Sequence, residues 1–141
     1  MTVMPWVTLF EGADFQLLHA NIEKGLWVVN TRFAPGIQIS THKHTGEVYA
    51  LTLAGSWHYL EYPEINVAGS YLYEPAGSIH TLQALPENDC ITEVWFAVHG
   101  ANLNLDADGN VESVWDAGYM SELYLRLCSE QGKCHPDVIG L

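Results

Sequence analysis

Two histidines with matching spacing are the first residues in the chain that could do chemistry. His42 and His44 stand two positions apart in a β-prone segment. Alternate side chains of a β-strand point to the same face, so both imidazoles can reach one point in space. Because imidazole is the commonest metal ligand, we interpret the pair as a candidate metal site. The alternative is a pair of ordinary surface or packed imidazoles, since His-x-His pairs are common by chance.

A third histidine, His80, follows a segment with a strong turn pattern. Pro75, Ala76 and Gly77 form a tight-turn sequence, in which proline presets φ and glycine admits a positive φ. Such a turn would aim the strand that carries His80 back across the fold.

Together the two segments resemble the two signature motifs of the cupin superfamily. The first motif is a glycine, five residues, His-x-His and a later glycine. The second is a glycine, five residues, Pro-x-Gly, two residues and a histidine. The resemblance implies an all-β fold, a single double-stranded β-helix or jelly-roll-like barrel, with His42, His44 and His80 as metal ligands. The matching residues are Gly36, His42, His44 and Gly55 in the first segment and Gly69, Pro75, Gly77 and His80 in the second.

The carboxylate of the first family motif is out of place in this chain. The pattern puts it four residues after the second histidine, where this chain has Val48, and the neighbouring acid is Glu47. Positions 44, 46 and 48 of a strand share a face and position 47 points the other way, unless a bulge shifts the register. We therefore expect three histidines with open coordination positions and no carboxylate, and Glu47 stays as the alternative fourth ligand.

The expected donor set fits several metals. Three neutral imidazoles suit iron, zinc, copper or nickel, and they leave the charge of a divalent ion intact. Within cupins, the stretch from Gly36 to His80 most resembles the dioxygenases that act on 2,4'-dihydroxyacetophenone and acetylacetone. The resemblance implies a non-haem Fe(II) enzyme, with zinc or nickel as alternatives. Its reaction would use O2 to cleave a C–C bond of a small-molecule ketone, a diketone or hydroxyketone, through a metal-chelated enolate.

A second hypothesis is a protein without catalysis. The chain also resembles the zinc-binding cupin domain of anti-sigma factors related to ChrR, which sense and regulate. Those factors carry an N-terminal helical domain, whereas residues 1–35 here are short and strand-like. That difference favours the dioxygenase, and a zinc-containing sensor or metabolite-binding module stays as the alternative.

Two acidic residues and several aromatic ones are candidates for the surroundings of the metal. Glu61 and Glu93 lie among aromatic and aliphatic residues, and burial there would raise the pKa of a carboxyl group and make it a proton acceptor. The alternative for each is an ordinary outward-facing carboxylate. The aromatic residues expected to line a substrate cavity, unless they are simply barrel core, are Trp27, Trp57, Tyr59, Tyr71, Tyr73 and Trp95.

Short strands separated by turn signals must position these residues. We expect one cupin domain over residues 1–141, with the barrel core at about 26–115 and a helix at about 117–128, where Asp116 can act as the N-cap. The role of the tail that contains Cys128, Cys134 and His135 is left open. The expected strands are 6–10, 15–20, 26–33, 37–44, 48–53, 57–61, 70–74, 78–84, 91–98, 101–105 and 111–115.

Composition and charge exclude several functions. The chain has 141 residues and a net charge of −12, so it lacks the basic surface needed to bind nucleic acid or an anionic membrane. No apolar run approaches the ~18 residues of a membrane span, and the first residues lack the character of a signal peptide. With only three cysteines, these features favour a cytoplasmic protein. Tyr49, Leu51 and Leu53 form an apolar outward stripe, which favours a homodimer.

Overall fold

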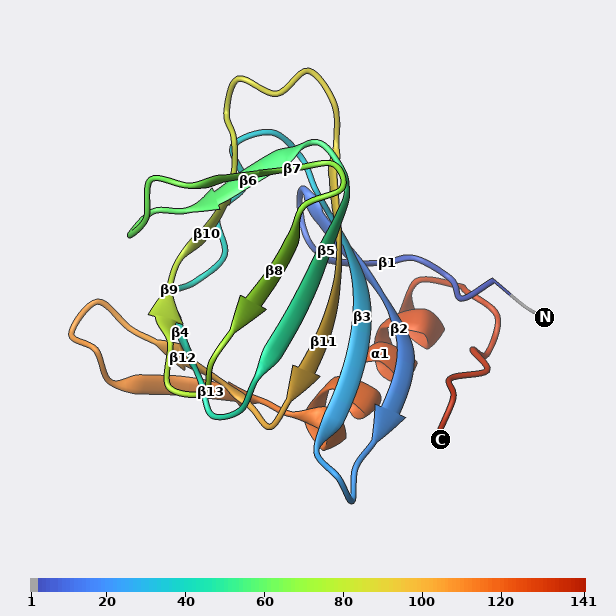
Figure 1. Ribbon diagram of the computed structural model, residues 1–141. Coiled ribbons are helices and arrows are strands. Elements are labelled where there is room, and N and C mark those ends of the chain that lie inside the picture. The colour runs from blue at the N-terminus through green and yellow to red at the C-terminus, as the bar shows by residue number, and fades with distance from the viewer. Residues whose placement is uncertain (1–2) are drawn as a thin grey trace.

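The largest element of the fold is a six-stranded antiparallel sheet (Figure 1). The computed structural model describes residues 3–141. The sheet has the order β1-β2-β3-β11-β5-β8, so the N-terminal strand lies at one edge and β8 at the other. The strands are β1 (Val7–Phe10), β2 (Ala13–Asn21), β3 (Leu26–Phe33), β11 (Thr92–His99), β5 (Val48–Ala54) and β8 (Tyr71–Glu74).

Two smaller sheets form a second layer that faces the large one (Figure 1). Residues from both layers meet in one buried cluster, where Ala50 and Val94 of the large sheet join Trp57 and Leu82 of the second layer. The prediction of an all-β fold is therefore confirmed. One small sheet holds β10 (Leu82–Ala84), β6 (Ser56–Tyr59) and β7 (Ile65–Val67), and the other holds β13 (Val111–Trp115), β12 (Asn102–Leu105), β4 (His42–His44) and β9 (Ile79–His80).

Strand alternation decides which side chains enter the space between the layers. In β5, Val48, Ala50 and Thr52 are buried, whereas Leu51 and Leu53 are exposed. A strand with one face on the core and one toward solvent alternates in this way. Residues at even positions of β5 therefore face the interior, and residues at odd positions face outward.

The single helix of the described residues closes the C-terminal end, as expected, and runs slightly further than predicted. It is α1 (Ala117–Glu130), and the side chain of Asp116 accepts a hydrogen bond of 2.8 Å from the backbone N–H of Tyr119. Its buried face joins the core cluster of β1, β2 and β3. The chain beyond α1 also packs on this core, because Val138 is buried and the N–H of Ala20 in β2 donates to the carbonyl of Ile139.

Two expected strands are shorter or divided in the structure, and one observed strand was not expected. Of the expected strand 37–44, only residues 42–44 form a strand. The backbone N–H of Ile37 donates to Ala34 in the preceding turn, and that of Ile39 donates to Leu82 in β10. The expected strand 78–84 is divided into β9 and β10. No expected strand covers β7, whose Ile65–Val67 segment pairs with β6 at the molecular surface.

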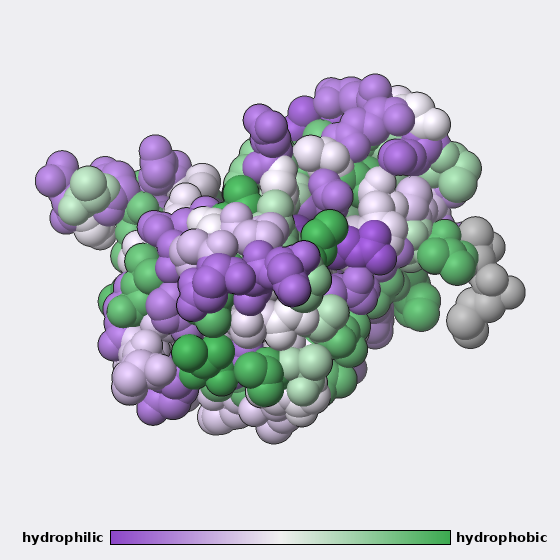
Figure 2. Space-filling view, turned by 90° about the horizontal axis from the view of Figure 1, so that it is seen from above, coloured by the Kyte–Doolittle hydropathy of each residue, from purple (hydrophilic) through white to green (hydrophobic). Residues whose placement is uncertain are grey.

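The surface mixes hydrophilic and apolar side chains. Seen from the end where β6 and β7 lie, hydrophilic residues cover much of the molecule and apolar ones emerge between them (Figure 2). Within residues 3–141, α1 falls short of the length and apolarity that a membrane crossing would require.

Removal of the helix cap tests the contribution of Asp116. We expect Asp116→Ala to lower the free energy of unfolding by about 1 kcal/mol, because the N–H of Tyr119 loses its acceptor. For a chain of this size the loss corresponds to a fall in Tm of about 3 °C, measurable by calorimetry. The exposed Asp108→Ala variant is the control, and an equal fall in both would contradict the capping role.

Candidate metal centre

Cross-strand pairing brings the three histidines together. β4 lies between β12 and β9, and the register places His42 directly opposite His80. His42 and His44 are two residues apart on β4, so their side chains share a face. One face of a short two-strand ladder therefore carries all three imidazoles.

The turn before β9 fixes the backbone of this ladder. Gly77 has a φ of +88°, which glycine adopts without strain. Its N–H donates to the carbonyl of His44 over 2.7 Å, and the N–H of His44 donates to the carbonyl of Ser78 over 3.0 Å. The Pro75–Gly77 turn and the residue after it thus hydrogen-bond both the carbonyl and the N–H of His44.

The three imidazoles form a nearly equilateral, buried group. Their ring centroids are 4.7 Å apart for His42 and His44, 4.9 Å for His42 and His80, and 4.8 Å for His44 and His80. One nitrogen from each ring lies within 4.8 Å of the others. All three residues are no more than 6% exposed.

The environment holds His42 and His80 in the form that binds metals. Burial, and then the charge of His44, lowers the pKa of His42 to about 4. Burial, followed by the charges of the other two histidines, lowers the pKa of His80 to about 3. Nδ1 of His42 donates to the carbonyl of Ser40 over 2.9 Å, which leaves the lone pair of Nε2 free for the site.

A buried carboxylate, Glu74, lies beside these rings. Its Oε2 is 3.0 Å from Nε2 of His44 and 3.4 Å from Nε2 of His80. Glu74 is 4% exposed, and burial raises the pKa of its carboxyl group. The sequence predicted three histidine ligands and no carboxylate, and the structure places this carboxylate next to two of the three. Strand alternation puts residues 72 and 74 on one face, which was the only sequence signal that Glu74 points inward with Leu72. The pairing of β8 with β5, which brings Glu74 to the histidines, could not be predicted from the sequence.

Glu47 lies outside the group, as strand alternation suggested. It is exposed, and its Oε2 accepts a hydrogen bond of 2.8 Å from the hydroxyl of Tyr73. The two residues meet on the outer face of the large sheet, where Tyr73 pairs with Tyr49.

Glu61 is tied to the flanks of the histidines. Its two oxygens accept hydrogen bonds from the backbone N–H of Thr81 over 2.6 Å and from the Thr81 hydroxyl over 2.8 Å. The hydroxyls of Thr81 and Thr41 are 2.6 Å apart. Because Thr81 follows His80 and Thr41 precedes His42, this network positions the two strands that carry the ligands.

Glu93 faces away from the centre. Its carboxylate pairs with Arg32 over 2.9 Å and also accepts a bond of 3.3 Å from Asn30. Alternation along β11 explains the placement, because Val94 and Phe96 point inward and residues 93 and 95 point outward. The structure therefore places Glu93 as the outward-facing carboxylate of the two readings that the sequence offered, and not beside the histidines.

The aromatic candidates divide by strand face. Tyr59 stacks on His80, with ring centroids 3.7 Å apart, and Trp57 is fully buried behind it. Tyr71 is 66% exposed and Trp95 pairs with Leu51 on the outer face, so neither lines a cavity of the described residues. Strand alternation explains this placement, since their neighbours Leu72 and Val94 take the inward positions.

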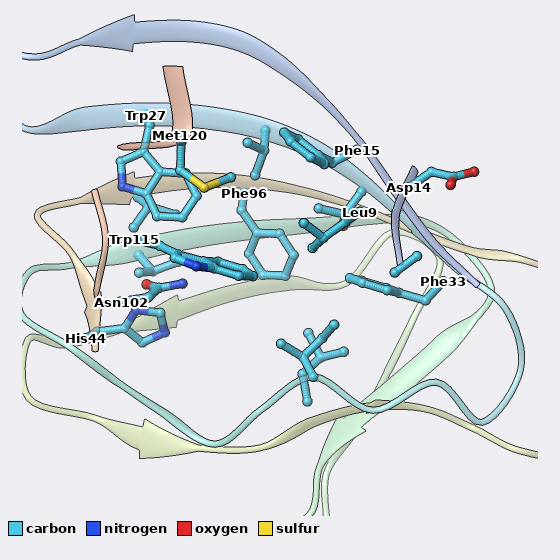
Figure 3. Close-up of a pocket in the computed structure, with 17 residues that line it drawn as sticks. Leu9, Asp14, Phe15, Trp27, Phe33, His44, Phe96, Asn102, Trp115 and Met120 are labelled. Atoms are coloured by element: carbon cyan, nitrogen blue, oxygen red, sulfur yellow. The ribbon is translucent and has the colours of Figure 1, made fainter. Parts of the chain in front are cut away.

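An apolar cavity of about 90 Å³ lies between the layers and ends at His44 (Figure 3). Asn102 and Trp115 lie close to His44 at this end, while Phe33 lies toward the other end. Nδ1 of His44 and Oδ1 of Asn102 are buried without a hydrogen-bond partner. The larger apolar side chains of the lining are Leu9, Phe15, Trp27, Phe33, Phe96, Trp115 and Met120.

A second cavity, of about 250 Å³, reaches the histidines from another side. His80 and Glu74 lie in its wall together with Tyr59, Tyr62 and Tyr73. The group is thus bordered by a mainly apolar cavity at His44 and a more polar one at His80.

The buried donors fit a metal ion. Nε2 of His44 and Nε2 of His80 are 2.9 Å apart, and Oε2 of Glu74 lies 3.0 and 3.4 Å from these two nitrogens. Nitrogen and oxygen donor atoms this close together are arranged for a cation. Three imidazoles with a carboxylate nearby suit iron, zinc or nickel, so the residues agree with the metals that the sequence suggested.

A family comparison matches this geometry. Residues 1–101 match the model of the ChrR cupin-like domain. The chain belongs to this cupin family. The three histidines and both motifs fall inside the matched range, so the resemblance of the sequence to cupins is confirmed.

Solved cupin structures share the fold over most of the chain. A cupin-like protein of unknown function from Ralstonia eutropha JMP134 is 41% identical, with a TM-score of 0.83 over 86% of this chain and 76% of that one. An RmlC-like cupin from the same organism is 26% identical, with a TM-score of 0.88 over 96% and 88% of the two chains. An acetylacetone dioxygenase from Acinetobacter johnsonii is 19% identical, with a TM-score of 0.81 over 90% and 91%. No curated protein sequence matches the chain.

The lowered pKa values predict how pH affects the stability of the metal-free protein. The pKa values of His42 and His80 lie below the ordinary value of 6.5 in the folded state, so at mildly acidic pH the unfolded state binds more protons. Stability is therefore complete above about pH 6.5 and declines toward about pH 4, while Glu74, with its raised pKa, opposes the trend. Calorimetry should find Tm lower by about 5 °C at about pH 5 than at about pH 7.5.

A double variant isolates the histidine contribution. In His42→Gln/His80→Gln the fall in Tm with pH should shrink to less than about half. A fall of the same size in the wild-type protein and the double variant would contradict the assignment.

Proposed function

We propose that this protein is a metal-dependent cupin enzyme, a non-haem Fe(II) dioxygenase that cleaves a C–C bond of a small diketone or hydroxyketone. The observation that carries the proposal is the buried triangle of His42, His44 and His80, whose ligand nitrogens lie within 4.8 Å of one another. The similarity in fold to an acetylacetone dioxygenase supports the same reaction class.

The cavity at His44 supports an apolar, uncharged substrate. Its lining includes three phenylalanines and two tryptophans, which favour a body of hydrocarbon or aromatic character. The unpartnered Oδ1 of Asn102 and Nδ1 of His44 offer two polar contacts at one end. A ketone with one polar end and one apolar end satisfies both parts of this cavity.

The residues divide the work of the reaction. Bound iron would polarise the carbonyl group and couple the substrate to O2, with both oxygen atoms entering the two products of C–C cleavage. His42, His44 and His80 would hold the ion, and the network of Glu61 and Thr81 would keep their strands in place. The apolar walls would exclude water from the reacting end.

Oxygen uptake tests the enzymatic proposal. Protein loaded with Fe(II) under anaerobic conditions should consume O2 when a β-diketone or a hydroxyacetophenone is added, in equimolar amount to the ketone, as measured with an oxygen electrode. His80→Ala should reduce uptake to background and lose tight iron binding while the fold, followed by circular dichroism, persists. The matched control is His58→Ala, because His58 bonds Gln83 on β10, away from the three ligands.

The alternative proposal is a zinc-containing sensor or metabolite-binding module. Membership of the ChrR cupin-like family supports it, as does the combination of metal ligands and an apolar cavity in one small fold. The two proposals differ in metal and turnover. Zinc in the protein as purified, together with no O2 uptake across the ketone panel by the Fe(II)-loaded form, would decide for the sensor.

We also propose a homodimer formed through the outer face of β5 and β8. Leu51 and Tyr71 are cross-strand partners there, and they are 39% and 66% exposed. Leu53 and Tyr73 extend the same face, with exposures of 46% and 48%. This mainly apolar patch, with Glu47 bonded to Tyr73 on the same face, allows two copies to meet although each carries a net charge of −12. The three free cysteines, Cys90, Cys128 and Cys134, support a cytoplasmic setting for this assembly.

A charge on the patch tests the dimer. Leu51→Lys should convert a dimer to a monomer in sedimentation equilibrium, because burying an unpaired ammonium at the interface costs several kcal/mol. Val111→Lys, on the exposed β13, should leave the mass unchanged. A monomeric wild-type protein at about 0.1 mM, or equal masses for the two variants, would contradict the interface.

A further inference from the structure

We infer that Glu74 is a fourth metal ligand, and that β8 supplies the carboxylate that the cupin pattern places after the second histidine. The inference rests on the proposed metal centre and concerns a residue that no part of that pattern assigns. It changes the donor set from three nitrogens to three nitrogens and one oxygen.

The sheet register puts Glu74 next to the position that the pattern reserves for an acid. The cupin pattern expects a carboxylate where this chain has Val48, and Val48 is the direct cross-strand partner of Glu74. Directly opposite residues have Cβ atoms about 5 Å apart and point to the same face. Both residues are buried, so a carboxylate at position 74 reaches the space that one at position 48 would reach.

The distances among Glu74, His44 and His80 are those of neighbouring ligands around one ion. Two ligands at about 2.1 Å from a metal are about 3.0 Å apart at a right angle and about 3.4 Å apart at the tetrahedral angle. The observed distances are 2.9 Å between Nε2 of His44 and His80, and 3.0 and 3.4 Å from these atoms to Oε2 of Glu74. Glu74 therefore joins the group on the side of His44 and His80.

The burial of Glu74 requires a positive partner. An ionised carboxylate without compensation is costly in the interior. In the described part of the chain no lysine or arginine pairs with Glu74, and its ion-pair contacts are with Nε2 of His44 and Nε2 of His80. A divalent cation between Glu74 and the histidines supplies the missing charge.

Strand β8 separates the two acids Glu47 and Glu74 onto opposite faces of the large sheet. Tyr73 holds Glu47 on the outer face by a hydrogen bond of 2.8 Å, and the next residue on the strand is Glu74, which points inward. The carboxylate neutralises one charge of a bound divalent ion. The centre then carries +1, which favours retention of the metal over a site of three neutral imidazoles.

Metal affinity gives the first test. Wild-type protein, Glu74→Gln and Glu47→Gln are loaded with zinc, and the Kd of each is measured by competition with a chromophoric chelator. Glu74→Gln should weaken zinc binding tenfold or more, and Glu47→Gln less than about threefold. Equal affinity of Glu74→Gln and wild type would overturn the inference.

A crystal structure of the zinc-loaded wild-type chain gives the second test and needs no variant to fold. Anomalous scattering should locate zinc with Oε2 of Glu74 at about 2.0–2.2 Å. A distance beyond about 3 Å, with a water between zinc and the carboxylate, would overturn direct ligation. His80→Ala separates this result from the underlying proposal, because an unchanged zinc stoichiometry in that variant would refute the three-histidine centre itself.

Discussion

The antiparallel pairing of β4 with β9 is the constraint on which the site depends. It places His42 opposite His80, and the two-residue spacing on β4 adds His44 to the same face. The turn at Gly77 bonds the backbone of His44, and Glu61 joins the flanking threonines. A loss of register by one residue would turn one imidazole out of the group, because the side-chain period of a strand is two. The surrounding sheets therefore serve to hold one short ladder in register.

Local sequence was sufficient for the features that depend on short spacing. The pair His42 and His44, the turn before His80 and the cap at Asp116 each involve residues within a few positions, and each lies where its spacing predicted. The inward and outward faces of β5 followed from alternation alone. The cupin fold required the two motifs taken together, since the strands themselves are too short and similar to define a topology.

Features that depend on register across distant strands could not be read from the sequence. Glu74 lies opposite Val48 because β5 pairs with β8, a pairing between residues 26 positions apart that no local sequence pattern predicts. Without the register, the sequence could not show that Tyr71 and Trp95 point to the outer face, because an aromatic side chain suits the outer face of a sheet and a cavity lining equally well. The ion pair of Glu93 could not be predicted either, because its partner Arg32 lies on β3, a strand distant in the sequence.

The charge of the centre follows from these same distances. With three histidines alone, a bound divalent ion would form a fully positive site inside a chain of net charge −12. Glu74 adds a buried carboxyl group whose ion-pair contacts among the described residues are with His44 and His80, and burial raises its pKa, so its ionised form is costly in the metal-free fold. Binding a cation relieves that cost, and a ligand that binds only the folded state stabilises it by mass action. Metal affinity and fold stability are therefore coupled through one carboxylate.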